Sequence, residues 1–113
     1  MASKHNMNID KGATFSLILE YKDSASQAID LSGYTAKMQL RYTNKPLLPL
    51  AIELSTENGR ITITGNQIQL YIAATDTEQL LLTGIIYDLE LYHEDTVIRL
   101  VEGNVIVSKE VTI

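Results

Sequence analysis

The chain has 113 residues, a formal net charge of −5 and no cysteine. This length suits one domain with its own core, and the lack of cysteine excludes a disulfide framework, a thiolate metal site and a cysteine nucleophile. The nine basic residues are scattered, which argues against nucleic acid as a partner, because its phosphates are bound by clustered lysine and arginine. No apolar run approaches the roughly 20 residues of a membrane-spanning helix, so we expect no membrane partner.

The first ten residues are mostly polar and small. We expect residues 1–10 to form a flexible N-terminal arm that can become ordered on a neighbouring molecule. Its apolar members Met7 and Ile9 are therefore candidate contacts for another protein. The remainder, residues 11–113, is predicted to form a single β-sandwich domain.

Alternation of apolar and polar residues with a period of two predicts strands along the rest of the chain. The clearest case is residues 34–42, where four apolar side chains alternate with polar ones. This pattern is typical of an antiparallel sheet with one face in water. The other predicted strands are residues 14–21, 51–54, 60–64, 67–72, 85–92 and 97–107.

The last predicted strand contains Gly103. Glycine within a strand often marks a bulge, and a bulge here would allow Leu100 and either Val105 or Val107 to face the same core in spite of their odd spacing. One long bulged strand is preferred, and the alternative is two strands joined by a turn at residues 102–104.

Turn and helix signals separate these strands. The pair Asn58-Gly59 predicts a tight turn, and the prolines at positions 46 and 49 interrupt the sheet because proline lacks an amide donor. Between them, Leu47 and Leu48 either fold back onto the edge of the core or form a contact surface for another chain. Thr75, followed three residues later by Glu78, has the spacing of a capping box and predicts one or two helical turns.

Seven or eight short strands with one short helix, and no regular alternation of helices and strands, are typical of an all-β antiparallel sandwich. The short helix precedes the penultimate strand.

The sequence offers little for catalysis. His93 precedes Glu94 and Asp95, and we interpret this segment as a solvated turn in preference to a metal site. Asp88 and Glu90 share one face of a strand, where a solvated pair is a better interpretation than an acid–base pair. We therefore predict no catalytic residue, no metal and no cofactor, and do not expect an enzyme.

An ordered set of short motifs resembles small structural proteins of tailed bacteriophages. The matching positions are Tyr87-Asp88-Leu89-Glu90, Arg99-Leu100, Gly103 with Val105 and Val107, Val111-Thr112, Gly12-Ala13-Thr14-Phe15 and Ile29-Asp30-Leu31-Ser32-Gly33-Tyr34. This resemblance covers most of residues 9–112.

The resemblance implies an immunoglobulin-like sandwich in the tail, baseplate or neck of a virion, similar to the N-terminal domain of upper-baseplate proteins. It implies a non-enzymatic subunit, made in the host cytoplasm, whose partners are other virion proteins and copies of itself in an oligomeric assembly. It carries over no catalytic residue and no cofactor.

The candidate protein-contact residues are apolar side chains in the arm, in the proline loop or on nominally wet strand faces. They are Met7, Ile9, Ile18, Leu47, Leu48, Ile86 and Tyr92. The alternative function is a carbohydrate or host-receptor binding module that uses exposed rings such as Tyr71 and Tyr92. With no tryptophan and one phenylalanine, the chain is poorly equipped for it.

Overall fold

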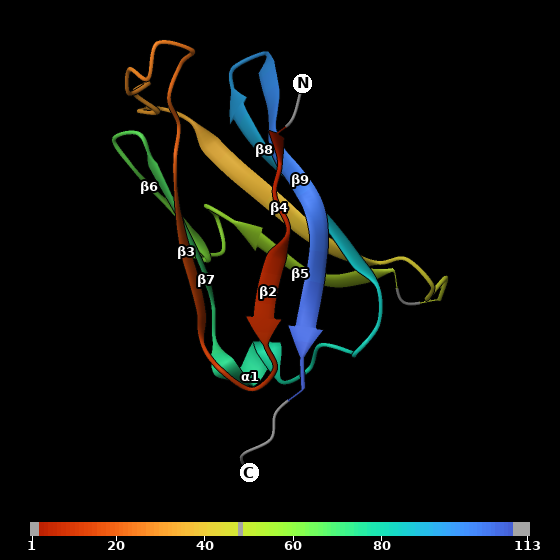
Figure 1. The fold of residues 1–113 in the computed structure, drawn as a ribbon. Coiled ribbons are helices and arrows are strands. Elements are labelled where there is room, and N and C mark those ends of the chain that lie inside the picture. Colours follow the sequence, from red (N-terminus) through yellow and green to blue (C-terminus); the bar gives the residue numbers. More distant parts are fainter. Residues whose placement is uncertain (1–2, 48, 110–113) are drawn as a thin grey trace.

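The structure is a computed structural model that describes residues 3–47 and 49–109. The described residues form nine strands and one short helix, arranged as two sheets packed face to face (Figure 1). The elements in chain order are β1 (Ser3–Lys4), β2 (Met7–Asp10), β3 (Phe15–Glu20), β4 (Thr35–Tyr42), β5 (Leu50–Ser55), β6 (Ile61–Thr64), β7 (Gln67–Ile72), α1 (Ala74–Thr77), β8 (Ile85–His93) and β9 (Thr96–Ser108).

The larger sheet, sheet A, has the order β1-β9-β8-β4-β5, and β2 pairs with β9 on the same side as β1. The smaller sheet, sheet B, has the order β3-β7-β6 and is antiparallel. The all-β prediction is confirmed, but the prediction of purely antiparallel sheets is wrong, because β1 and β2 run parallel to β9. The sequence could not decide this point, since side chains alternate between faces in the same way in parallel and antiparallel strands.

The core lies between the sheets and is filled by the alternating apolar residues. In β4, Met38 and Leu40 are buried, and their neighbours on β8, Leu89 and Tyr87, are buried with them. The predicted inward set of β7, including Leu70, is fully buried as well. At about 25 cal/mol per Å² of apolar surface, this burial is the main force that holds the sheets together.

The N-terminal segment differs from the expected flexible arm. Residues 7–10 form β2, and their side chains alternate between buried and exposed. Met7 is 3% exposed and Ile9 is 0% exposed, so both belong to the core and are not available to another protein. The physical reason is that the edge of β9 offers a free backbone ladder, while Met7 and Ile9 supply an apolar pair with the period of a strand.

The β8–β9 hairpin is confirmed, and its second strand is a single long element. The bulge lies at Leu100, because Leu89 pairs with Val101 and Glu90 pairs with Arg99. The predicted bulge at Gly103 is therefore wrong in position, although Leu100 and Val105 both pack on the core as predicted.

Gly103 has a different role. It pairs in register with Tyr87, and a Cβ atom there would lie 2.8 Å from the carbonyl carbon of His5 and closer still to its oxygen. That carbonyl accepts a hydrogen bond from the Tyr87 hydroxyl, and the His5 N–H donates to the Glu102 carbonyl at 2.9 Å. The glycine is thus required for the close approach of the N-terminal segment to β9.

The helix α1 closes the end of the sandwich where the chain crosses from β2 in sheet A to β3 in sheet B (Figure 1). It begins after Ala73 with no side-chain cap, and Glu78 follows its last turn, so the predicted capping box is wrong. The buried Thr77 hydroxyl donates to the Ala13 carbonyl at 2.8 Å and accepts from the Gly12 N–H at 3.1 Å. No helix in the described segments has the length and apolar content needed to span a membrane.

Candidate protein-contact surface

The structure separates the other candidate contact residues from one another. Ile18 is 54% exposed on the outer face of sheet B, and Ile86 is 48% exposed on the outer face of sheet A. Leu47 is 98% exposed in the loop between β4 and β5, so it does not fold back onto the core. Leu48 lies outside the described residues. The candidates therefore do not form one surface, because they are divided between the outer faces of the two sheets and the loop between β4 and β5.

Tyr92 is half-buried on the outer face of sheet A. Its hydroxyl donates to the Glu90 carboxylate at 2.8 Å. Burial of the ring, followed by this hydrogen bond, raises the pKa of Tyr92 to about 12. Tyr71 is exposed on sheet B instead. The two rings cannot form one stacking platform for a sugar, because they lie on the outer faces of opposite sheets.

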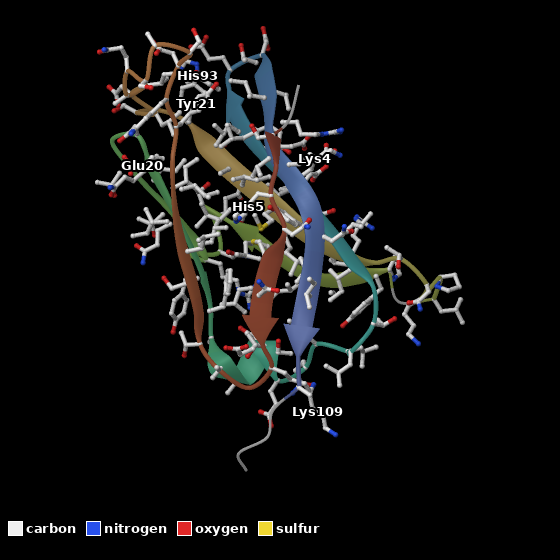
Figure 2. All side chains as sticks on the ribbon, in the orientation of Figure 1. Lys4, His5, Glu20, Tyr21, His93 and Lys109 are labelled. Carbon is white, nitrogen blue, oxygen red and sulfur yellow. The ribbon has the colours of Figure 1, made fainter. Side chains whose placement is uncertain are left out.

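The outer face of sheet A carries a band of paired charges across its strands. The Arg99 Nε atom lies 3.5 Å from a carboxylate oxygen of Asp88 and 3.9 Å from one of Glu90. Lys4, which Figure 2 shows near the N-terminal end of the chain, forms an ion pair with Glu102 at the edge of the sheet. The Lys4 ammonium, through its hydrogen bond and its charge, holds the pKa of the Glu102 carboxyl below its usual value.

The band continues toward the opposite edge. The Gln39 amide donates to the Glu53 carboxylate at 2.8 Å, and Arg41 donates to the Gln39 amide oxygen at 2.7 Å. All of the charged and amide side chains of this band except Glu53 line a shallow hollow of about 530 Å³, and Ile86 lines it as well. Exposed ion pairs of this kind contribute only about 0–1 kcal/mol each, so their main effect is to fix the side chains of a polar surface.

Below this band, toward the end of the sandwich that carries α1, the outer face of sheet A becomes apolar. Ile106 on β9 is 55% exposed, and Leu82 in the segment between α1 and β8 is 54% exposed. Both line a second shallow hollow of about 420 Å³. Ile86 pairs with Asn104, two residues before Ile106, which makes Ile86 and Ile106 diagonal neighbours on one face. We call Leu82, Ile86 and Ile106 the apolar patch.

Two of these three residues were not among the sequence candidates. Ile106 lies in an apolar run whose facing depends on the bulge, and the bulge at Leu100 turns Ile106 outward. Leu82 follows α1 in a short apolar run, in which Leu80 is buried with 1% exposure while Leu82 is 54% exposed. A correct assignment of register would have identified Ile106 from the sequence.

The predicted solvated turn at His93 has an additional contact. The His93 ring stacks on the Tyr34 ring, with centroids 4.7 Å apart. Within the described residues, no cluster of three histidine or carboxylate side chains is arranged to hold a metal ion. The carboxylates of Asp88 and Glu90 face Arg99 and form ion pairs with it.

A scan of protein-family models and a search of curated proteins found no match to this chain. The resemblance of the chain to tailed-phage proteins, the location of the chain in a virion and the partners of the chain therefore stay predictions.

Proposed function

We propose that the chain is a non-enzymatic structural subunit that acts through protein–protein contacts. The observation that carries this proposal is the apolar patch of Leu82, Ile86 and Ile106, whose side chains are each about half exposed on or beside strands. Leu82 and Ile106 line one hollow, and Ile86 is a diagonal neighbour of Ile106. Exposed apolar groups that gather on one face and are bordered by polar residues are characteristic of interaction sites. The band of Arg99, Asp88 and their neighbours supplies such a polar border.

We infer that the sandwich is immunoglobulin-like. One sheet has the order β9-β8-β4-β5 and faces the other sheet, which has the order β3-β7-β6. This matches immunoglobulin domains in which an extra edge strand, here β5, is added beside strand C, here β4. The helix α1 lies between β7 and β8, immediately before the penultimate strand, where the resemblance leads us to expect a short crossover. These two features support the assignment.

We further propose that the assembly is the tail, baseplate or neck of a tailed-phage virion. The support is the phage-like pattern itself, whose separate pieces meet in space. Arg99 of the Arg-Leu piece lies 3.5 Å from Asp88 of the Tyr-Asp-Leu-Glu piece, and Tyr87 pairs with Gly103 across the same hairpin. These positions of the phage-like pattern therefore lie together on one hairpin of the fold.

The test is made in the phage that encodes the chain. Mass spectrometry of purified particles is expected to detect the chain, and the double substitution Ile86→Ser with Ile106→Ser is expected to reduce its incorporation at least several-fold. The matched control is Val97→Ser, which changes a side chain that is 57% exposed near the opposite end of β9. Particles that lack the chain, or that incorporate the folded double variant normally, would contradict the proposal.

A further inference from the structure

The free edges of the two sheets differ in how well they are protected. The edge formed by β1 and β2 is interrupted between Lys4 and Met7, and β6 has only four residues. On β5 there is a register shift opposite Leu40, and the Glu53 carbonyl accepts hydrogen bonds from the side chains of Asn58 and Arg60. Interruptions, bulges and side-chain caps of this kind are how proteins prevent a sheet edge from pairing with another chain.

The edge of β3 has none of these protections. Its six residues pair with β7 in one continuous register. Beyond the end of the strand, the Tyr21 N–H donates to the Asn66 carbonyl at 2.8 Å. Hydrogen bonding alternates along an antiparallel pair, so Phe15, Leu17 and Leu19 direct their backbone groups to β7.

The backbone N–H and C=O groups of Ser16, Ile18 and Glu20 therefore point to the free edge. Among the described residues, no hydrogen-bond partner reaches these groups. An edge with three consecutive free donor–acceptor pairs is a template for another strand.

The side chains of β3 favour the same conclusion. Ile18 is 54% exposed, while Phe15, Leu17 and Leu19 face the core but are only half-buried. Glu20 lies at the exposed end of the strand (Figure 2). The strand is therefore apolar at its centre, and its inward face is left incompletely covered by this single copy.

We propose that β3 pairs antiparallel with β3 of a second copy, about a two-fold axis at Ile18. This inference rests on the proposed assembly function and identifies one self-contact within it. Sheet B would become a continuous six-stranded sheet across the dimer, with the order β6-β7-β3 in each half.

The register follows from the free backbone groups. Centring the axis on Ile18 pairs Ile18 with Ile18 of the second copy and pairs Ser16 with Glu20 of the second copy. All three free residues of each copy then form hydrogen-bonded pairs, which gives about six new backbone hydrogen bonds. Centring the axis on Leu17 would leave the Glu20 groups unpaired within the strand.

The same register is complementary in its side chains. Each Glu20 carboxylate is opposite a Ser16 hydroxyl and not opposite a second carboxylate, which avoids the cost of directly opposed like charges. Leu17 is opposite Leu19 of the second copy, so the half-buried inward residues cover each other. A two-fold axis closes the contact at a dimer, and no strand edge of β3 is left to extend a fibre.

The chain contains no cysteine, so a single introduced thiol can form a disulfide only between copies. In the proposed register the two Cα atoms at position 18 are about 5.5 Å apart, within the range that a disulfide bridges. We expect Ile18→Cys to give a covalent dimer under mild oxidation. We also expect the unmodified chain, of 12.6 kDa, to show twice that mass in solution by light scattering.

Two matched controls test the register. Gln69 pairs with Ile18 on the neighbouring strand β7 and is exposed on the same face, but across the dimer its two copies are about 14 Å apart. The two copies of Glu20 are offset by four residues, about 13 Å. Neither Gln69→Cys nor Glu20→Cys is expected to form the covalent dimer.

A charge substitution tests the β3 contact without any cross-linking reaction. Ile18→Lys places two ammonium groups directly opposite each other, and we expect a folded monomer. Ile86→Lys, at a similarly exposed site on sheet A, is expected to stay dimeric. If Ile18→Lys does not fold, the cross-linking comparison decides the question.

The inference is overturned if the unmodified chain is a monomer, or if Gln69→Cys or Glu20→Cys cross-links as readily as Ile18→Cys. It fails separately from the proposed function. A chain that is found in particles but is monomeric in solution overturns the β3 contact alone. A dimer cross-linked at position 18 that is not found in particles keeps the β3 contact and contradicts the phage assignment.

Discussion

At the scale of single residues, Gly103 is important because its lack of a side chain leaves room for the backbone of His5. The carbonyl of His5 occupies the place that a Cβ atom would need, and the Tyr87 hydroxyl donates to the same carbonyl. A side chain at position 103 would push the N-terminal segment away from β9 and break this hydrogen bond.

We therefore predict that Gly103→Ala lowers the free energy of unfolding by about 1–3 kcal/mol, as expected for an overpacked site. Urea denaturation is the measurement. The same substitution in a chain that lacks residues 1–6 is the control, because removing His5 removes the clash and most of the effect should disappear. An equal loss in both chains would show that the strain arises elsewhere in the hairpin.

At the scale of elements, β2 decides whether the N-terminal segment is an appendage or part of the sandwich. Its residues pair with β9 from Val105 to Ser108, and Ile9 is fully buried between the sheets. The strand is held both by a parallel ladder and by the burial of two apolar side chains.

Ile9→Ala is expected to lower the free energy of unfolding by about 2–5 kcal/mol, the cost of a large-to-small change in a packed core. Asn8→Ala, one residue earlier on the exposed side of β2, is the matched control and should change stability by no more than about 0.5 kcal/mol. Thermal denaturation of both variants makes the comparison. If Ile9→Ala lowers the free energy of unfolding no more than Asn8→Ala does, residues 7–10 form a flexible arm in solution and are not part of the core.

At the scale of the whole molecule, two tyrosines link stability to alkaline pH. Burial raises the pKa of Tyr87 to about 12, and burial with the Glu90 hydrogen bond raises that of Tyr92 to about 12. The unfolded-state value is about 10, so the folded protein holds both protons more tightly. This contribution is complete below about pH 10 and is lost as the pH rises toward 12.

The free energy of unfolding, measured by urea titration at a series of alkaline pH values, should therefore fall over that interval. Replacing both tyrosines by phenylalanine should make the decline shallower, because the variant has no phenolic protons to lose at these positions. A decline of unchanged steepness in the double variant would assign the effect to other groups.

The alternation of apolar residues was sufficient to predict the strands β3 to β9 and most of the core, whereas the single long last strand was predicted from a bulge assigned to the wrong residue. Physical chemistry explains this success, because a residue such as Leu40 or Leu89 must leave water, and a period of two allows only one face to do so. The same reasoning placed Ile18 and Ile86 on wet faces, where the structure has them.

The sequence by itself determined that the protein is a two-layered β structure with exposed apolar groups, because burial depends on side chains whose order is fixed along the chain. Only the tertiary structure decided the partner of β2, the position of the bulge at Leu100, the proximity of Leu82 to Ile106 and the unprotected edge of β3. These features depend on which strands become neighbours and in what register. Backbone groups are alike in every residue except proline, so local sequence cannot specify how they pair.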